Sequence, residues 1–198
     1  ATEPFKGGKQ YDVVLTNPPF GKRDAVEFDG DKISGLDPQI TLNALDAMKD
    51  NGRAAIIIGG NFEYRPNGAI KDKPAFWSHL YNHYNVVGVI DMSGDMYARQ
   101  GTTFPTRMIL INGRRSEEDR KQGTCYPPVQ ADAVRKAETF DDLYEIVNEL
   151  IEFNLNNKTN GTIISSEGLS SKPVSDKPQG KIRRMGNQGK PDKGDSSI

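Results

Sequence analysis

Four short apolar runs limit what this chain can fold into. They occupy residues 11–16, 53–58, 86–91 and 106–111, and each is about one strand long. The second is continuous in apolar residues, which is typical of a strand buried on both faces of a parallel sheet. Helical patterns separate the first three runs, but no helix fits between the last two, so we expect these to be antiparallel neighbours. The order predicts an α/β fold, the second half of a doubly wound sheet with an antiparallel last strand.

The connections are predicted from turn and cap signals. Residues 21–36 are charged and punctuated by glycine, which favours a mobile loop. A helix should follow with Asp37 as its N-cap and Pro38 at its first position. Asn-Gly should end that helix, with Gly52 in a left-handed cap.

A second set of connections leads into the C-terminal part. We expect a loop over 61–74, a helix over 74–84 with Trp77 in the core, and a loop over 92–104. After a charged linker, Thr139 can cap a helix together with Asp142 in a capping box, and an amphipathic stripe runs from Phe140 to Ile151.

The composition divides the chain into three parts. We expect a partial catalytic domain over 1–113, a linker and C-terminal helix over 114–155, and a flexible tail over 156–198 that is rich in Gly, Ser and Lys. The chain has 198 residues, does not begin with Met and enters the first strand almost at once, so we expect it to be a fragment of a longer protein.

Charge and cysteine content exclude several classes of protein. The net charge of −1 is unlike that of a non-specific nucleic-acid binder, so any DNA would find most of its phosphate contacts elsewhere. The single cysteine, Cys125, allows no internal disulfide framework and no cysteine-based zinc site. No run approaches the ~18 apolar residues of a membrane helix, and no signal peptide is visible, so we expect a cytoplasmic protein without membrane association.

The first strand ends in the sequence Asn17-Pro18-Pro19-Phe20. Neither proline can donate to a strand ladder, and both restrict φ to about −65°. The result is a rigid tip at the carboxyl end of a strand, where open α/β sheets bind their ligands. This tip presents an amide side chain, free backbone carbonyls and a phenyl ring.

Such a tip suits a conjugated amino group, for example N6 of adenine. Two acceptors, the Asn17 side-chain oxygen and the Pro18 carbonyl, could take its two hydrogens and favour a more nucleophilic nitrogen. Phe20 could stack on a base flipped out of a duplex, which would help to offset the cost of unpairing. This is catalysis by positioning and electrostatics, and it needs no titratable nucleophile.

The order of these motifs resembles the N6-adenine-specific DNA methyltransferases. The resemblance rests on the strand followed by Asn-Pro-Pro-Phe, on Asn-Gly-Arg-Ala-Ala-Ile-Ile-Ile (51–58), on Val-Val-Gly-Val-Ile-Asp (86–91), and on Gly-Thr-Thr-Phe-Pro-Thr-Arg-Met-Ile-Leu-Ile (101–111). It covers residues 10–113 and is strongest to the modification subunits of type I restriction-modification systems and to related phage or mobile-element methylases.

The resemblance implies a class I, Rossmann-like methyltransferase fold and S-adenosyl-L-methionine as the cofactor. It assigns Asn17, Pro18, Pro19 and Phe20 to catalysis, and Asn17 and Pro18 to the cofactor contact that remains here. It places residues 97–106 at the border of the target-base pocket. It also implies DNA methylation in a bacterium, phage or mobile element, with DNA as partner and a specificity subunit or upstream domain to recognise the sequence.

The chain departs from the family before the first strand. Family members carry a Gly-rich cofactor loop and an acidic ribose-binding residue there, and Gly7-Gly8 has neither a strand before it nor a helix after it. We therefore expect most of the cofactor site to be absent and the chain alone to be inactive. A homo-oligomer would cover the sheet edge and face left open.

Two other functions fit the same residues. Asn-Pro-Pro-(Phe/Tyr) also occurs in methyltransferases that act on a protein glutamine amide or on guanine N2 of ribosomal RNA. Alternatively, the chain is a cofactor-free module that binds DNA or a partner subunit.

Other candidate residues receive plainer interpretations. His79 and His83 have the i, i+4 spacing of metal ligands, but no third ligand is evident, so we interpret them as surface histidines and expect no metal site. Asp91 and Asp95 are interpreted as polar residues at a strand end rather than as acid–base groups. The Lys181–Arg184 cluster is interpreted as part of a solvated tail.

Overall fold

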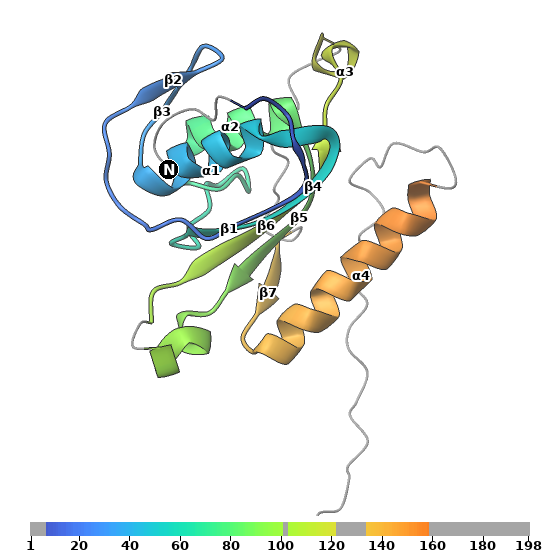
Figure 1. Cartoon of the computed structure of the whole chain (residues 1–198). Coiled ribbons are helices and arrows are strands. Elements are labelled where there is room, and N and C mark those ends of the chain that lie inside the picture. The colour runs from blue at the N-terminus through green and yellow to red at the C-terminus, as the bar shows by residue number, and fades with distance from the viewer. Residues whose placement is uncertain (1–6, 101–102, 122–133, 159–198) are drawn as a thin grey trace, which may run out of the picture. The chain divides into compact units, whose positions relative to one another are not determined.

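The computed structural model describes residues 7–100, 103–121 and 134–158, and its centre is a mixed five-stranded sheet (Figure 1). The strand order is β1-β4-β6-β5-β7. β1 pairs with β4 and β5 with β7 in parallel, whereas β6 is antiparallel to both of its neighbours. The predicted antiparallel pairing of the last two runs is therefore confirmed. The strands are β1 (Tyr11–Thr16), β4 (Met48–Gly59), β5 (Tyr84–Met92), β6 (Thr106–Arg114) and β7 (Arg135–Ala137).

Helices lie on both faces of this sheet. α1 (Leu36–Asp46) and α2 (Pro74–His83) cover one face, and α4 (Phe140–Lys158) crosses the other, as Figure 1 shows. The larger core lies under α1 and α2, where Trp77 is 1% exposed, as predicted. A smaller core lies under α4 and includes Ile146 and Leu150. None of the helices within the described residues is long and apolar enough to cross a membrane.

The capping box that begins α4 is confirmed. The backbone N–H of Asp142 donates to Thr139 Oγ1 (3.1 Å), and the backbone N–H of Thr139 donates to Asp142 Oδ2 (3.0 Å). The apolar stripe of α4 is only partly buried, because Phe140 and Ile151 are about half exposed. The helix also runs to Lys158, three residues past the predicted boundary.

The bounds of α1 differ from those predicted. Gly35 is the N-cap and makes no side-chain cap, and Asp37 is buried inside the first turn. The helix ends at Asp46 rather than at Asn-Gly, because the next carbonyl, that of Ala47, accepts the N–H of Tyr11 and joins the chain to β1. Gly52 therefore lies within β4 and makes no left-handed cap.

The prediction of a mobile loop over residues 21–36 is wrong. This segment contains a hairpin of β2 (Val26–Phe28) and β3 (Asp31–Ile33), and Ile33 is fully buried. Asp29 and Gly30 both have positive φ, 44° and 88°, which is typical of a two-residue type I′ turn. The Asp-Gly pair between two short runs was the signal for this hairpin.

Three further segments are more ordered than expected. A 3₁₀ helix, η1 (Gly94–Gln100), lies in the loop after β5, and a short helix, α3 (Glu117–Lys121), lies in the charged linker. β7 extends the sheet from a region in which the sequence indicated no strand. Cys125 and the Lys181–Arg184 cluster lie outside the described residues, as does the tail from residue 159 onward.

Candidate active site

The Asn17–Phe20 tip lies at the carboxyl end of β1, beside the end of β4. Pro18 is buried, whereas Asn17, Pro19 and Phe20 are exposed. The buried proline packs the tip against the protein, and the residues on either side of it face outward. The structure therefore places the predicted amide and phenyl groups where a ligand can reach them.

The tip lines a cavity of about 420 Å³. The opposite wall comes from Tyr97 in η1, from Phe104, and from Thr106 at the start of β6. Its volume lies within the range of small-molecule sites. The structure thus brings together the tip and the segment between the last two long strands, which the sequence predicted to share one pocket. The lining residues are Asn17, Pro18, Pro19, Phe20, Ile57, Tyr97, Phe104 and Thr106.

Two aromatic rings face each other at the mouth of this cavity. The ring centroids of Phe20 and Phe104 lie 5.8 Å apart and the planes are tilted by 33°. The two side chains are 40% and 52% exposed. Both rest on Gly59, since a Cβ there would lie 3.1 Å from Phe104 and 3.2 Å from Phe20. Gly59 therefore sets how closely the rings approach the sheet, a role that the sequence did not reveal.

Polar groups in the cavity are available to a ligand. No hydrogen bond among the described side chains engages the Asn17 amide. The Thr106 hydroxyl is buried in the same cavity and has no hydrogen-bond partner there. A buried hydroxyl without a partner costs free energy unless a ligand or water satisfies it. An acceptor, a donor and two rings thus converge on one space.

A second cavity of about 860 Å³ adjoins the first and shares Phe20 and Phe104 with it. Its lining carries three cationic side chains, Lys22, Arg23 and Lys73, and three carboxylates, Asp24, Asp37 and Asp72. Cations of this kind neutralise phosphates in nucleic-acid complexes. The sequence analysis did not single out these three cations, because they come from two loops that the fold brings together.

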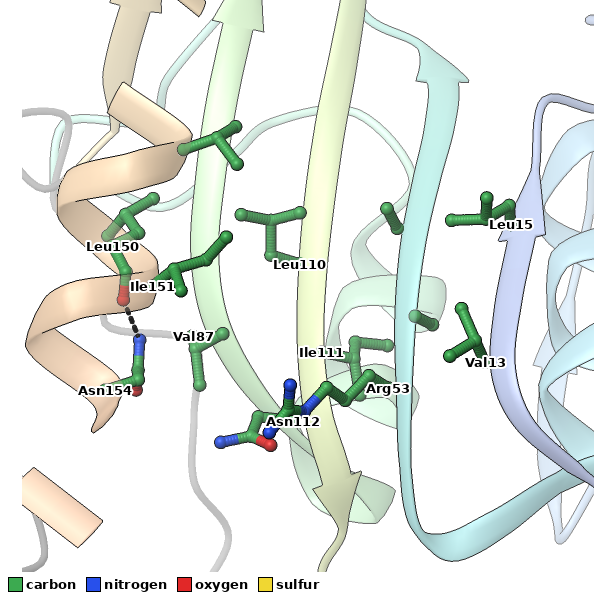
Figure 2. Close-up of a pocket in the computed structure, with 13 residues that line it drawn as sticks. Val13, Leu15, Arg53, Val87, Leu110, Ile111, Asn112, Leu150, Ile151 and Asn154 are labelled. Atoms are coloured by element: carbon green, nitrogen blue, oxygen red, sulfur yellow. Dashed lines mark hydrogen bonds between the residues drawn. The ribbon is translucent and has the colours of Figure 1, made fainter. Parts of the chain in front are cut away.

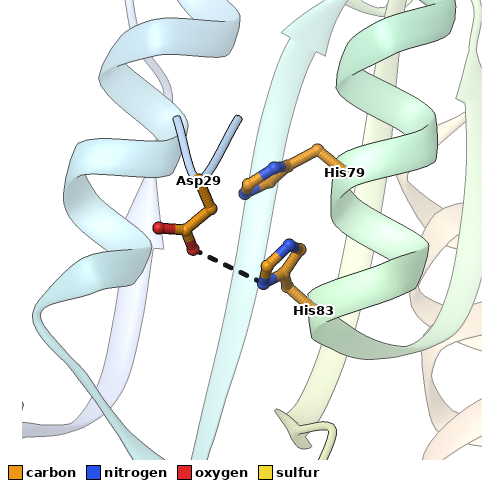
Figure 3. A group of neighbouring side chains, drawn as sticks. All are labelled: Asp29, His79 and His83. Atoms are coloured by element: carbon orange, nitrogen blue, oxygen red, sulfur yellow. Dashed lines mark ion pairs between the residues drawn. The ribbon is translucent and has the colours of Figure 1, made fainter. Parts of the chain in front are cut away.

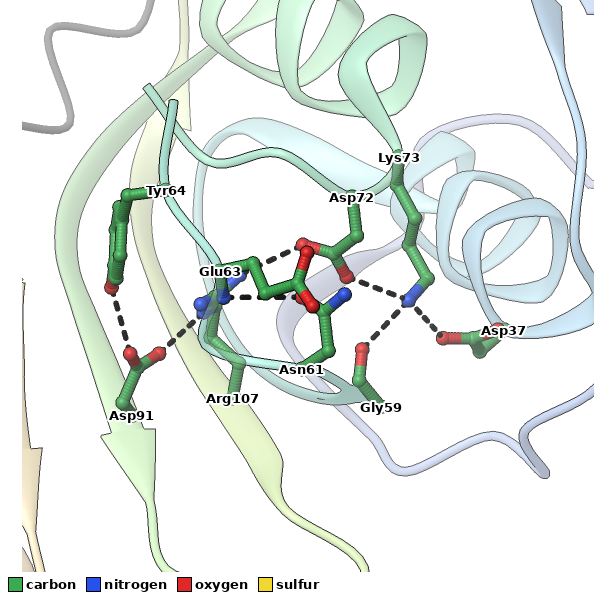
Figure 4. Close-up of polar contacts among 9 residues, drawn as sticks. All are labelled: Asp37, Gly59, Asn61, Glu63, Tyr64, Asp72, Lys73, Asp91 and Arg107. Carbon is green, nitrogen blue, oxygen red and sulfur yellow. Dashed lines mark hydrogen bonds and ion pairs between the residues drawn. The ribbon is translucent and has the colours of Figure 1, made fainter. Parts of the chain in front are cut away.

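A buried polar network holds the wall of this second cavity (Figure 4). Arg107 is fully buried and donates from Nε to Asp91 Oδ1 (2.5 Å) and from Nη1 to Asp72 Oδ1 (3.3 Å). Tyr64 donates to the other Asp91 oxygen (2.7 Å). Asp91 is therefore a structural partner of Arg107, in agreement with its interpretation as a non-catalytic polar residue.

The network affects the protonation of its members. Burial opposes the charge of Arg107, but its hydrogen bond and ion pair with Asp91 outweigh this and raise the pKa of the guanidinium. Burial, together with the bond to Asp91, raises the pKa of the Tyr64 hydroxyl. Both groups therefore keep their protons at any physiological pH.

Lys73 links the network to α1. Its Nζ donates to the Gly59 carbonyl (2.7 Å) and to Asp72 Oδ2 (3.1 Å), and lies 3.7 Å from Asp37 Oδ2. Burial raises the pKa of Asp37, and the Lys73 charge only partly offsets this. The ammonium group thus ties the end of β4 to the loop before α2 and to the first turn of α1.

An apolar groove of about 210 Å³ lies on the opposite face of the sheet, beside α4 (Figure 2). β1 contributes Val13 and Leu15, which are 59% and 76% exposed, and α4 contributes Leu150 and Ile151. β1 is also an edge strand, since it pairs only with β4 in the described sheet. An edge and a face of the sheet therefore remain uncovered next to the Asn17–Phe20 tip.

Comparisons with known proteins add little beyond this geometry. No protein-family model matches the chain, and no curated protein matches it. Among solved structures, a type I R-M system described for its complex assembly and conformational transition is 18% identical, with a TM-score of 0.39. A modification subunit of a putative type I restriction enzyme from Vibrio vulnificus YJ016 is 16% identical, with a TM-score of 0.40.

Both likenesses are partial. Each covers 53% of this chain and less than a quarter, 22% and 23%, of the other chain.

Proposed function

We propose that this chain is the acceptor-binding part of an S-adenosyl-L-methionine-dependent methyltransferase that acts on N6 of adenine in DNA. The observation that supports this best is the cavity at the end of β1, where the Asn17 amide, the Pro18–Pro19 turn and two exposed phenyl rings converge. The resemblance of residues 10–113 to the N6-adenine methyltransferases gives the same reading of these residues.

The acceptor would be held by two oxygens. The Asn17 side-chain oxygen and the Pro18 carbonyl accept the two hydrogens of N6, so the nitrogen lone pair is withdrawn from the ring and directed at the methyl donor. Because Pro18 is buried and followed by a second proline, the turn cannot relax when the amino group binds. Positioning of this kind lowers the barrier without a titratable group.

The base would be held by stacking. Phe20 and Phe104 present about half of their surfaces to solvent, and a planar ring can displace water from both. Stacking on one aromatic side chain is worth about 1–3 kcal/mol, similar to the few kcal/mol that flipping a base requires. The adjoining cavity offers Lys22 and Arg23 to the phosphates that flank the flipped nucleotide, whereas Lys73 is held by Asp72 and Asp37.

The donor would need a site beyond the residues that the structure describes. In the family, the Gly-rich cofactor loop precedes the Asn-Pro-Pro-Phe strand, and residues 7–10, the described residues before β1, form no strand or helix. The uncovered edge and face of β1, with Val13 and Leu15, are where upstream elements of that kind would pack. A specificity subunit or a further domain would supply DNA sequence recognition.

The test measures transfer of a labelled methyl group in the longest form of the protein that the host encodes, with DNA, RNA and protein acceptors in parallel. Label on adenine N6 in DNA is the expected result, and Asn17→Ala should abolish it while leaving the circular dichroism spectrum unchanged. Asn51→Ala is the matched control, because Asn51 is exposed and lines neither of the two cavities beside the tip. Undiminished methylation by Asn17→Ala, or label only on RNA or protein, would refute the proposal.

A further inference from the structure

Two histidines of α2 and an aspartate of the β2–β3 hairpin form a cluster (Figure 3). His79 and His83 are one turn apart on α2, and their rings stack with centroids 4.1 Å apart and an angle of 17°. Asp29 comes from the turn of the β2–β3 hairpin. One potential ligand atom of each residue lies within 4.8 Å of the other two. The third ligand that the sequence did not reveal is thus supplied by the hairpin that it did not predict.

His79 is oriented for ligation. It is 4% exposed, rather than on the surface as the sequence suggested, and its Nδ1 lies 2.9 Å from Asp31 Oδ2. In this arrangement Nδ1–H donates to the carboxylate, so Nε2 is the atom with a free lone pair. Histidines that bind metals nearly always donate their other N–H to a carboxylate or carbonyl in this way. Asp31 therefore prepares His79 to act as a ligand.

His83 has a competitor for its lone pair. Its Nδ1 lies 3.7 Å from Asp29 Oδ2 and 3.0 Å from Nη1 of Arg120. Arg120 belongs to α3, none of whose residues is buried. Because a guanidinium can only donate, it occupies the same nitrogen lone pair that a metal would use. An ion that binds here must displace an exposed arginine side chain.

We propose that His79, His83 and Asp29 form a binding site for a divalent transition metal of the zinc class. Two imidazoles and one carboxylate are ligands that suit Zn²⁺ better than Mg²⁺ or Ca²⁺. Tetrahedral zinc with bonds of about 2.0–2.1 Å holds its ligand atoms about 3.4 Å apart. The two stacked imidazole planes are nearly parallel and do not meet at one ion, so the His83 ring would have to rotate and the exposed Asp29 side chain would have to move, and water would complete the coordination.

The metal would fasten the hairpin to α2. Residues just before the hairpin, Gly21 to Asp24, line the larger cavity beside Phe20. Among the described residues, two backbone hydrogen bonds join this segment to the start of α1. The N–H of Leu36 donates to the Gly21 carbonyl, and the N–H of Gly35 donates to the Arg23 carbonyl. Gln39 Nε2 of α1 also donates to the Asp24 carbonyl (2.6 Å), so a bound ion would add a further anchor to this wall of the candidate site.

Titration of the tag-free, chelator-treated full chain with ZnCl₂ in a calorimeter tests the proposal. One ion per chain is expected, with an increase in Tm and with the visible absorption of tetrahedral Co²⁺ when cobalt replaces zinc. His83→Asn and Asp29→Asn should each weaken binding about 100-fold or more. Asn tolerates the positive φ of position 29, so this variant should keep the turn.

Two further variants separate ligation from a structural effect. Arg120→Gln removes the competitor and should tighten zinc binding, a result that no loss of folding can produce. Glu27→Gln removes one exposed carboxylate from the same hairpin but outside the cluster, and should leave binding unchanged. Equal zinc affinity in the wild type and in the His83→Asn/Asp29→Asn double variant, or weaker binding by Arg120→Gln, would overturn the proposal.

Discussion

Replacement of Arg107 by methionine should strongly destabilise the fold. Arg107 is fully buried and Asp91 is 2% exposed, so neither charge can be satisfied by water when its partner is removed. Arg107→Met keeps most of the apolar stem and leaves Asp91 with a single hydrogen bond, from Tyr64. The uncompensated carboxylate is the main consequence of the substitution.

The size of the effect follows from this burial. Removing one partner of a buried ion pair costs about 3–5 kcal/mol, whereas neutralising both partners costs much less. Arg107 also lies 5.7–5.8 Å from the ring centroids of Phe62, Tyr64 and Trp77, contacts worth about 0.5–2 kcal/mol each where they are desolvated. We therefore expect a loss of about 4 kcal/mol, much of the ~5–15 kcal/mol that stabilises a typical domain.

Urea unfolding followed by fluorescence provides the assay. Trp77 is the only tryptophan of the chain and contacts Arg107, so its emission reports on the network directly. The double variant Arg107→Met/Asp91→Asn should lose about 2 kcal/mol less than the sum of the two single variants, the coupling expected for direct contacts.

An exposed pair provides the matched control. Lys71 and Glu63 also form an ion pair (2.6 Å), but both side chains are more than half exposed. Lys71→Met should cost less than about 1 kcal/mol, and that cost should fall as salt is added. Additive effects of the Arg107 and Asp91 substitutions, or equal costs for Arg107→Met and Lys71→Met, would refute the reasoning.

Four smaller predictions concern single side chains. Burial raises the folded-state pKa of Asp37 above its unfolded value of 3.8, so Asp37 contributes stability that is lost as the pH rises through these two values. Asp37→Asn should remove this contribution and flatten the pH dependence of unfolding between pH 3 and 7, with the part due to Asp46 remaining. Gly59→Ala should leave unfolding by urea nearly unchanged but lower methyl transfer, since its Cβ displaces the two phenyl rings. Gly94→Ala should cost about 1–3 kcal/mol by the same assay, because its Cβ would lie 1.9 Å from the Thr103 carbonyl oxygen. Leu15→Ser should change the free energy of unfolding by less than about 0.5 kcal/mol, because Leu15 is largely exposed; a larger loss would show that the groove is covered in solution.

The features that the sequence predicted are those set by local chemistry. The four apolar runs became strands of one sheet, and the short connection between the last two allowed only an antiparallel pair. Thr139 and Asp142 cap α4 because both partners of a capping box lie within one turn. The Asn17–Phe20 tip lies at a strand end, where neither of its two prolines is needed as a ladder donor.

What the sequence missed depends on residues far apart in the chain. Arg107 stands in an apolar run and has no local signal, and its partners Asp91 and Asp72 are 16 and 35 residues away. His79 meets Asp31 across 48 residues, through a hairpin whose Asp-Gly turn was read as part of a loop. The role of a charged residue whose partner is distant in the sequence can therefore be recognised only in the folded structure.

The start of β6 contains one residue of a site that the sequence predicted and one residue of a network that it did not. Successive residues of a strand point to opposite faces, so Thr106 and Arg107 must serve different sides of the sheet. Thr106 lines the cavity with the Asn17–Phe20 tip, whereas Arg107 anchors the loop that carries Tyr64 and Asp72 under α2. β6 lies antiparallel between β4 and β5, so the start of this one strand contributes to two sites. One is the candidate acceptor pocket, and the other is the buried network that holds the loop carrying Tyr64 and Asp72. For this reason, a substitution at Arg107 should change the shape of the larger cavity more than that of the smaller one.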